Sequence, residues 1–282
     1  MMLIADSGST KTEWREVKDG IPGKSYISSG LNPFFISCED IKRLLSSEMP
    51  DLNIEGVSRV YFYGTGVSNA TKAEILREAM GSCFGTAELF VGSDLLGAAR
   101  SLCMNEPGIA CIIGTGSNSC YYDGREIASN VPPLGYILGD EGGGAVIGRK
   151  LVSSVLKKQL SGNTIEKFFR AYPFTPADIL ENVYNMPFPN RYLGQFARFI
   201  ADNIDVPELR SIITSSFDEF IVRNVLSYPE ARKYKVHFTG SIAYHFRPFL
   251  EELLMKYQLQ PGIFTISPMD DLVKFHIQNP DI

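Results

Sequence analysis

The 282-residue sequence has few of the residues that build metal centres or disulfide frameworks, with five cysteines, three histidines and one tryptophan. No two cysteines have the CxxC spacing of zinc and redox motifs, and their odd number argues against a disulfide framework. Three histidines are too few for a histidine-rich metal centre. The cysteines therefore indicate reduced thiols, and a cytoplasmic location is expected.

Long apolar runs and clusters of basic charge are also missing. No run approaches the ~20 apolar residues that span a bilayer, and the N-terminus lacks the pattern of a signal peptide. The net charge is -5, whereas a nucleic-acid surface requires clustered Lys and Arg. The densest basic patch, Arg149-Lys150 with Lys157-Lys158, has helical spacing and indicates a solvated helix face. The sequence therefore argues against a membrane or a nucleic acid as partner.

The chain instead has an ordinary globular composition, 44% hydrophobic and 21% charged, with strands and helices that alternate along it. This alternation predicts an α/β architecture. A turn cluster at residues 105–108 marks a boundary between domains. We expect one domain at residues 1–105 and a second at 106–268, the second with a helical insertion at about 160–230. A C-terminal helix within 269–282 is a candidate to complete the first domain.

Two segments share one plan, an apolar strand, a turn of small residues and a second strand. They are residues 2–17 and 109–128, and their turns read "DSGSTK" and "GTGSNS". Glycine lacks a Cβ, so backbone N–H groups can approach an anion, and hydroxyls add further donors. Asp6 beside a phosphate requires a cation between them, most simply Mg²⁺. Either turn alone is better explained as an ordinary β-hairpin turn. Two such turns at matching places of a repeated unit instead favour a pair of turns that bind a magnesium-bound triphosphate.

Other nucleotide motifs do not occur. There is no GxxxxGK[ST] sequence, and "GGAVIGRK" at 143–150 has Arg149 between the glycine and the lysine. "GTGSNS" at 114–119 lacks the third glycine of a dinucleotide-binding fingerprint and leads into a strand. A phosphate site in this chain would therefore be of the hairpin type.

Five segments together resemble the sugar-kinase branch of the actin-like ATPase superfamily: "DSGSTKT", "VGSDLLGAAR", "CIIGTGSNS", "GYILGDEGGG" and "HFTGSIA". The match is best to the N-acetylglucosamine kinase family, which is grouped with the BadF/BadG/BcrA/BcrD ATPases, and runs from residue 3 to about 248. The resemblance implies an α/β fold of two actin-like (ribonuclease H-like) ATPase domains with a cleft between them. It also implies ATP and Mg²⁺ as cofactors and phosphorylation of the 6-hydroxyl of an amino sugar, most simply N-acetylglucosamine.

The resemblance assigns roles to particular residues. Asp94 matches the catalytic base, and phosphoryl transfer does require a carboxylate that accepts the hydroxyl proton. Asp94 also suits the N-cap of a helix at 95–104. Asp6 would hold Mg²⁺ through water. The residues implied to bind ATP are Ser7, Gly8, Ser9, Thr10, Lys11, Gly114, Thr115, Gly116, Ser117, Gly240 and Ser241, and those implied to contact the sugar are Asn32, Asp94, Asn118, Gly135 and Asp140.

Residues 140–144 carry two acids followed by three glycines. Asp140 and Glu141 are expected in the first turn of a helix, where acids favour the helix dipole. Each glycine in a helix costs roughly 1 kcal/mol relative to alanine. Three in a row therefore indicate close approach of backbone or ligand.

One departure from the family pattern leaves the sugar open, because many relatives have a Trp beside the glycine before the GDEG segment, where this chain has Tyr136. A second departure concerns the adenosine site, where the family usually has a second glycine and this chain has Ser241. Glucosamine, N-acetylmuramic acid and N-acetylmannosamine remain alternatives to N-acetylglucosamine. The oligomeric state, a homodimer among the options, is also open.

Two other functions are weighed against the kinase. The activator of a 2-hydroxyacyl-CoA dehydratase needs cysteines that ligate an iron–sulfur cluster, and these cysteines have no such pattern. The other alternative is a non-enzymatic actin-like regulator that binds nucleotide or sugar. A rise in ADP production on addition of the sugar would favour the kinase over a regulator.

Overall fold

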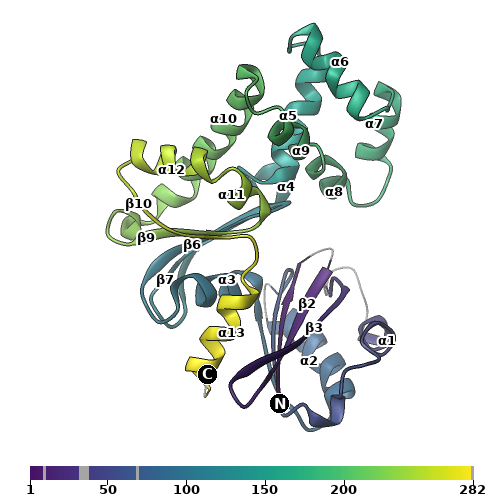
Figure 1. Ribbon diagram of the computed structural model, residues 1–282, viewed down its shortest axis with the longest axis vertical. Coiled ribbons are helices and arrows are strands. Elements are labelled where there is room, and N and C mark those ends of the chain that lie inside the picture. Colours follow the sequence, from purple (N-terminus) through teal and green to yellow (C-terminus); the bar gives the residue numbers. More distant parts are fainter. Residues whose placement is uncertain (9–10, 32–37, 68–69, 281–282) are drawn as a thin grey trace. The chain divides into compact units, whose positions relative to one another are not determined.

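The computed structural model describes residues 1–8, 11–31, 38–67 and 70–280. The residues expected to act at Ser9, Thr10 and Asn32 lie outside these ranges. The chain divides into two compact units, each built around one sheet (Figure 1). Unit 1 comprises residues 1–106, 124–126 and 267–282, and unit 2 comprises residues 107–123 and 127–266.

Unit 1 contains a five-stranded mixed sheet in the order β3-β2-β1-β4-β5. The strands β1, β4 and β5 are parallel, whereas β2 and β3 run antiparallel at one side. The β1–β2 pair forms the first of the two expected hairpins. The strands are β1 (Met2–Ser7), β2 (Lys11–Lys18), β3 (Ile21–Ser29), β4 (Arg59–Gly64) and β5 (Glu88–Ser93).

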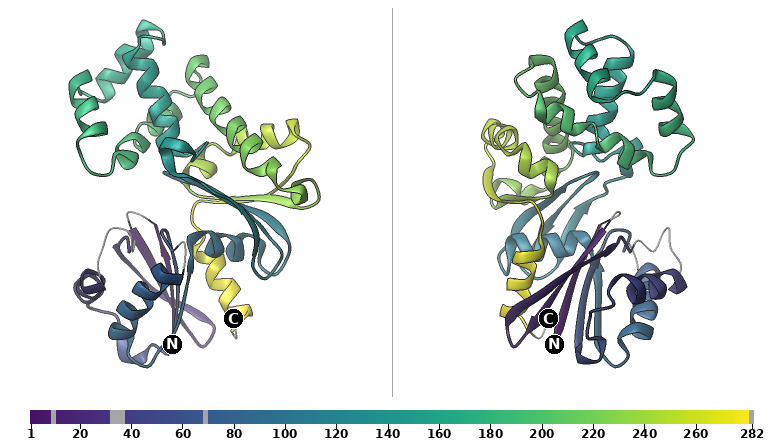
Figure 2. Two further views of the ribbon diagram at one scale, coloured as in Figure 1. Left: turned by 180° about the vertical axis from the view of Figure 1, so that it is seen from behind. Right: turned by 45° about the vertical axis from the view of Figure 1, so that its right-hand side comes forward.

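Helices cover both faces of this sheet (Figure 2). Along β1, Leu3 and Ala5 join the core that includes residues of α1 and α2, whereas Ile4 joins the core that includes residues of α13. A strand buried on both faces reads as a continuous apolar run, which explains the "MMLI" start of the sequence. The helices of unit 1 are α1 (Cys38–Glu48), η1 (Ile54–Gly56), α2 (Ala70–Phe84), α3 (Asp94–Cys103) and α13 (Met269–Gln278).

The last helix, α13, is joined to the rest of unit 1 by a buried polar contact. The Tyr63 hydroxyl accepts a hydrogen bond from Arg100 at 2.6 Å and lies 2.9 Å from Nε2 of His276 in α13. Burial and the Arg100 charge lower the pKa of His276 to about 3, so its neutral ring can accept the Tyr63 hydroxyl proton. The guanidinium of Arg100 also lies over the rings of Phe90 and Phe275. Residues from the far end of the sequence therefore complete the core of unit 1.

Unit 2 contains a sheet with the same plan, in the order β10-β9-β6-β7-β8. Its strands β6, β9 and β10 are parallel, and β7 and β8 are antiparallel, so β6 takes the place that β1 has in unit 1. The repeat seen in the sequence thus extends to five strands in each unit. The strands are β6 (Gly108–Ile113), β7 (Ser117–Tyr122), β8 (Ile127–Val131), β9 (Lys235–Thr239) and β10 (Gln260–Thr265).

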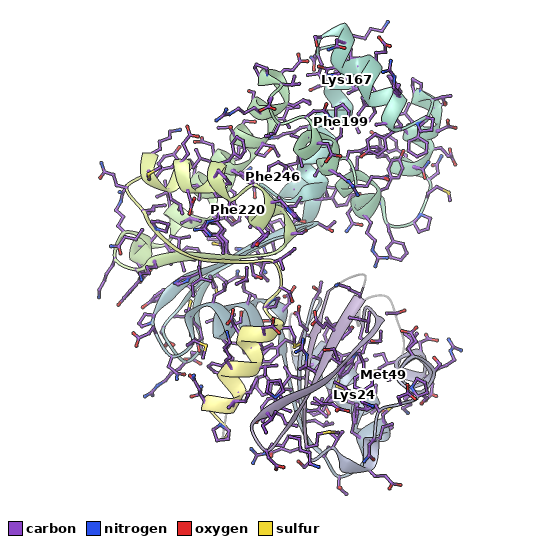
Figure 3. All side chains as sticks on the ribbon, viewed as in Figure 1. Lys24, Met49, Lys167, Phe199, Phe220 and Phe246 are labelled. Atoms are coloured by element: carbon purple, nitrogen blue, oxygen red, sulfur yellow. The ribbon has the colours of Figure 1, made fainter. Side chains whose placement is uncertain are left out.

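A large helical part packs on the unit 2 sheet and fills its core with aromatic side chains. Phe199, Phe220 and Phe246, labelled in Figure 3, are all buried there. Local signals start these helices; for example, the N-cap Thr175 forms a capping box with Asp178, and Pro176 is the first residue of α7. The helices are α4 (Gly135–Leu138), α5 (Gly144–Leu156), α6 (Gly162–Ala171), α7 (Pro176–Tyr184), α8 (Pro189–Gly194), α9 (Ala197–Asp202), α10 (Pro207–Arg223), η2 (Val225–Ser227), η3 (Pro229–Arg232), α11 (Ser241–His245) and α12 (Arg247–Lys256).

Among the helices of the described ranges, none is both long enough and apolar enough to cross a bilayer.

Candidate functional site

In unit 1, polar residues gather where the three parallel strands end. Ser7, Gly64 and Ser93 are aligned across β1, β4 and β5. Thr65 and Asp94 follow directly on β4 and β5. The carboxyl ends of parallel strands are where α/β proteins place ligands, so this edge of the sheet is the candidate site of unit 1.

The Asp94 carboxylate is held at both oxygens. Its Oδ2 accepts a hydrogen bond from Thr65 Oγ1 at 2.7 Å, and its Oδ1 accepts one from the N–H of Leu95 at 2.8 Å. Burial raises the pKa of Asp94, and these hydrogen bonds act in the opposite direction. The residue as a whole is half-buried.

The expectation that Asp94 caps its helix is wrong. The N-cap of α3 is Ser93, whose hydroxyl accepts the N–H of Leu96 at 3.2 Å, and Asp94 is the first residue of the helix itself. Because Ser93 takes the capping role, the Asp94 carboxylate is not required to terminate the helix. It can therefore serve a ligand.

Asp6, near the end of β1, is the second acid at this edge. Burial, the negative charge of Asp94 and that of Glu13 raise its pKa to about 7. A carboxylate in this setting is a ligand that Mg²⁺ accepts, because the cation prefers oxygen and would relieve the repulsion between two acids. The described residues contain no cluster of three or more His, Cys, Asp or Glu side chains suited to a metal. Asp6 alone therefore has the chemistry of a carboxylate ligand to a hard cation.

The first turn, between β1 and β2, is stabilised by hydroxyl groups. The Ser7 hydroxyl is buried, lies 2.7 Å from Thr12 Oγ1 and accepts the N–H of Leu31 at 3.0 Å. The N–H of Gly8 donates to the carbonyl oxygen of Lys11 at 2.9 Å. The Ser7 side chain is thus engaged within the protein and fixes the entry to the turn, whereas Lys11, the first residue of β2, is exposed.

The second turn, residues 114–117 between β6 and β7, is stabilised by backbone contacts instead. The carbonyl oxygens of Gly114 and Thr115 accept the N–H groups of Gly144 and Ala145, each at 2.8 Å. A Cβ on Gly143 would lie 2.8 Å from the carbonyl carbon of Gly116. The glycines before α5 therefore permit the direct backbone approach that their number in the sequence indicated.

Asp140 lies against the second turn, but not in a helix. The expectation that Asp140 and Glu141 occupy a first helical turn is wrong, because α5 begins at Gly144 and a four-residue helix, α4, precedes them. Asp140 has φ +52°, and its Oδ1 accepts the N–H of Ser117 at 3.2 Å. Burial raises the pKa of Asp140. The carboxylate of Asp140, an expected sugar contact, thus lies against the second turn.

Glu141 has a structural role that the sequence analysis missed. Its carboxylate forms an ion pair with Arg223 at 2.7 Å and accepts a hydrogen bond from Asn224 at 3.3 Å, while its carbonyl oxygen accepts the Ser117 hydroxyl at 2.7 Å. The side chain is largely buried. These contacts connect the second turn to the end of α10, about 80 residues away in sequence, which no local pattern reveals.

Gly240 and Ser241 lie at the end of β9, beside the start of the second turn. Gly240 has φ +113°, and a Cβ there would lie 2.4 Å from the carbonyl oxygen of Ile113. Only glycine therefore fits this position. Ser241 opens α11. The neighbouring hydroxyls of Thr239 and Thr265 are buried without a hydrogen-bond partner, so donors and acceptors for a ligand or water lie near this edge.

Asn118 is held in one orientation by a residue that the sequence analysis missed. Its Oδ1 accepts the N–H of Ser119 at 2.9 Å and the Nδ2 of Asn130, on β8, at 3.0 Å. With its oxygen engaged twice, the amide of Asn118 offers its NH₂ group as a donor. The pairing of β7 with β8 brings the two asparagines together, and sequence spacing alone does not predict it.

Gly135, the remaining expected sugar contact, begins α4 with φ +74°. The N–H of Asp140 donates to the carbonyl oxygen of Pro133 at 2.9 Å, which closes this segment into a loop. Leu134, Ile137 and Leu138 in the loop are exposed to 61–70%. The structure thus places an apolar loop directly before Asp140.

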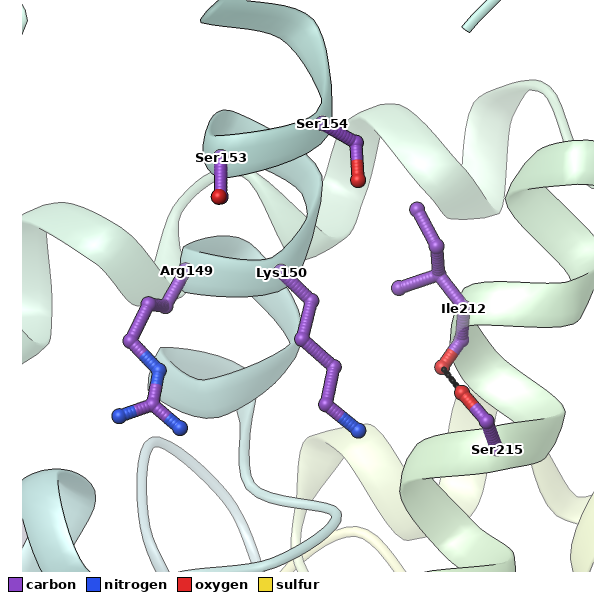
Figure 4. A pocket seen from close by; sticks show the side chains of 6 residues that line it. All are labelled: Arg149, Lys150, Ser153, Ser154, Ile212 and Ser215. Carbon is purple, nitrogen blue, oxygen red and sulfur yellow. Dashed lines mark hydrogen bonds between the residues drawn. The ribbon is translucent and has the colours of Figure 1, made fainter. Parts of the chain in front are cut away.

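A separate pocket of about 430 Å³ lies between α5 and α10 (Figure 4). Its Lys150 is paired with Glu219 at 2.8 Å, and its Arg149 donates to the carbonyl oxygen of Tyr136 at 3.1 Å. Both cations are thus engaged by the protein, as expected for a solvated helix face. The lining residues are Arg149, Lys150, Ser153, Ser154, Ile212 and Ser215.

The structure therefore gathers the expected residues into one group in each unit. Unit 1 places Asp6 and Ser7 at the end of β1 and Asp94 directly after β5. Thr65, which follows β4 between these two strands, joins them as a residue that the sequence analysis missed. Unit 2 gathers a second group about the turn after β6. That group consists of Gly114, Thr115, Gly116, Ser117, Asp140, Gly240 and Ser241.

Comparison with known proteins identifies relatives among solved structures. The structure of the "Putative N-acetylglucosamine Kinase" of Porphyromonas gingivalis is 46% identical, covers 99% of this chain and 100% of its own, and superimposes with a TM-score of 0.96. The protein of the same description from Chromobacterium violaceum has 17% identity, with 97% and 98% coverage and a TM-score of 0.73. No family profile and no curated protein sequence matches the chain.

A more distant structure shares the fold. The ROK family glucokinase of Streptomyces griseus, solved in complex with glucose and AMPPNP, has 13% identity, 97% coverage of both chains and a TM-score of 0.56. With the two mixed sheets described above, these matches confirm the expected α/β class and the two-domain actin-like ATPase fold.

Proposed function

This chain belongs to the N-acetylglucosamine kinase family of actin-like ATPases, and from that membership we propose that it transfers the γ-phosphoryl group of ATP to the 6-hydroxyl of an amino sugar. N-acetylglucosamine is the favoured acceptor, because the relative that shares 46% of its residues carries that sugar in its name. Nucleotide binding is supported by a fold neighbour that was solved with AMPPNP.

In this proposal Asp94 is the general base. It accepts the proton of the sugar hydroxyl while the sugar oxygen forms a bond to the γ-phosphorus and the bond to the β,γ-bridging oxygen breaks. Both carboxylate oxygens are oriented by hydrogen bonds. A base fixed near its reacting position supplies about 10²- to 10⁴-fold of rate.

The remaining residues bind and orient. Backbone N–H groups of the two turns, with Lys11, would hold the phosphates, and Gly240 and Ser241 would contact the adenosine. Mg²⁺ at Asp6 would neutralise phosphate charge when bound. Asn118, with its oxygen already engaged, would donate to a sugar oxygen, and Asp140 would accept from a sugar hydroxyl. Asn32 and Gly135 complete the proposed sugar contacts.

The observation that carries the proposal is the position of Asp94 within a chain of this family. It follows β5 at the carboxyl edge of the parallel strands, hydrogen-bonded at both oxygens, with its helix capped by another residue.

The test is a coupled assay of ADP production with Mg²⁺-ATP and a panel of amino sugars. We expect N-acetylglucosamine to raise ADP production far above the sugar-free rate, with formation of the 6-phosphate detected by mass spectrometry. An ATPase rate that no sugar changes would overturn the kinase and favour a nucleotide switch. A higher kcat/KM for glucosamine, N-acetylmuramic acid or N-acetylmannosamine would keep the reaction and correct the acceptor.

A further inference from the structure

The geometry points to Thr65 as the residue that positions the Asp94 carboxylate for proton transfer, a role that rests on the proposed kinase function. Thr65 follows β4, the strand between β1 and β5. Its Oγ1 donates to Asp94 Oδ2 at 2.7 Å, while the N–H of Leu95 donates to Oδ1 at 2.8 Å. One donor on each oxygen fixes the rotation of the carboxylate about its own axis.

Thr65 is in turn fixed to the first turn. Its N–H donates to the carbonyl oxygen of Ser7 at 2.8 Å. The Ser7 hydroxyl, buried between Thr12 and the N–H of Leu31, holds that residue in place. A continuous series of contacts thus runs from the residue that enters the first turn to the proposed base. Thr65 therefore couples the position of the first turn, which would bind phosphate, to the position of the Asp94 carboxylate, which would accept the proton.

The Thr65 hydroxyl also favours the ionised form of Asp94. Asp6, on β1, is the neighbouring acid that interacts with Asp94, and Glu13 and Lys11, on β2, act on Asp6 in turn. Burial raises the pKa of Asp94, and the Thr65 hydrogen bond is the largest influence that lowers it. Without this donor the carboxylate would keep its proton to a higher pH, and a protonated base cannot accept another proton.

The hydrogen bond between Thr65 and Asp94 is not needed to cap helix α3. Ser93 caps α3 through the N–H of Leu96, and the backbone of Thr65 is held by Ser7 whether or not its hydroxyl is present. The hydroxyl therefore has one partner of consequence, the Asp94 carboxylate.

The experiment compares Thr65→Val, which removes the hydroxyl at nearly constant shape, with Thr65→Ser, which keeps it. We expect Thr65→Val to lower kcat by about 10- to 100-fold, the effect of losing a hydrogen bond to a charged group. The KM values for ATP and sugar should stay within about threefold, because the bond acts on the reacting group and not on binding. The acidic limb of the kcat–pH profile should move to higher pH, and Thr65→Ser should restore both kcat and the profile.

Thr164→Val is the matched control. Thr164 is also buried, and its hydroxyl lies 2.9 Å from Ser161 Oγ in unit 2. This variant should lose stability but keep the wild-type kcat and pH profile. If Thr65→Val has wild-type kcat and an unshifted acidic limb, or if Thr65→Ser fails to rescue it, the positioning role is overturned.

A second readout separates this proposal from the proposed function. If wild-type protein phosphorylates no amino sugar, the kinase proposal fails, and the carboxyl ¹³C shift of Asp94 is titrated by NMR instead. A higher pKa of Asp94 in Thr65→Val than in wild type supports the role of the hydroxyl. Equal pKa values in the two proteins overturn it.

Discussion

Unit 1 and unit 2 have the same five-stranded plan, but they place different chemistry at the carboxyl ends of their parallel strands. In unit 1 the residue before the end of β1 is Asp6, and Asp94 follows β5. At the places that correspond to them, unit 2 has Ile112 within β6 and Ile266 after β10. The acids are thus at the strand ends of one copy alone, whereas the other copy has glycines packed backbone to backbone. Under the proposed function, this difference would assign proton transfer and cation binding to unit 1 and an anion-binding turn to unit 2.

The largest expected effect tests whether the acids of unit 1 carry the chemistry. Asp94→Asn keeps the shape of the side chain but removes the base, so kcat should fall by about 10²- to 10⁴-fold. Binding of ATP and sugar, measured by calorimetry, should change little. Asp51→Asn, an exposed carboxylate in the same unit, should leave kcat unchanged. A near-normal rate in Asp94→Asn would show that the difference between the units has no catalytic meaning.

A second prediction concerns Asp6 and the pH dependence of stability. The folded protein raises the pKa of Asp6 from an ordinary 3.8 to about 7, so folding favours the protonated form. This stabilisation is complete below about pH 4 and is lost as the pH rises through 7, at a cost on the order of 2–4 kcal/mol in the free energy of unfolding.

The measurement is urea denaturation between pH 4 and pH 8 without divalent cation. The free energy of unfolding of wild type should fall more steeply with pH than that of Asp6→Asn. Addition of Mg²⁺ at pH 8 should stabilise wild type and have little effect on the variant. If the free energy of unfolding changed with pH equally in the two proteins, Asp6 would not be an acid with a raised pKa in the folded state.

The smallest expected effect tests the backbone packing of unit 2. In Gly143→Ala the new Cβ would meet the backbone of Gly116 and Asp140 at 2.8–2.9 Å, so we expect a loss of about 1–3 kcal/mol of stability. Affinity for Mg²⁺-ATP should weaken as well, because the second turn must shift. Gly162→Ala is the control, since a Cβ there meets nothing within 4 Å, and it should be neutral or stabilising. Equal melting temperatures for the two variants would contradict the rigid turn.

Much of the fold follows from local signals in the sequence. Apolar runs buried on both faces, such as that of β1, and small-residue turns gave the repeated hairpins and the α/β class. The segments around Asp6, Gly114 and Asp94 were specific enough to indicate the family. What the sequence could not provide were contacts between distant elements, among them Glu141 with Arg223 and Thr65 with Asp94. Such contacts depend on how helices, strands and loops far apart in the sequence pack together.

The two errors at the site have a similar origin. Ser93 and Asp94 are both good N-cap residues, and only the backbone shows which of them precedes the first helical turn. Asp140 adopts a positive φ that aspartate tolerates better than most residues. A run of acids and glycines before an apolar helix does not reveal where regular φ and ψ begin, so the helix was placed too early.

The contact between Tyr63 and His276 has a consequence for synthesis on the ribosome. The strands of unit 1 emerge early, but the helix that covers one of their faces is encoded after all of unit 2. Until residues 269–278 leave the exit tunnel, Ile4, Tyr61 and Tyr63 lack the apolar surface that finally covers them. All residues of unit 2 are therefore synthesised before unit 1 has its last helix. We expect unit 1, although its strands are translated first, to complete its fold after unit 2.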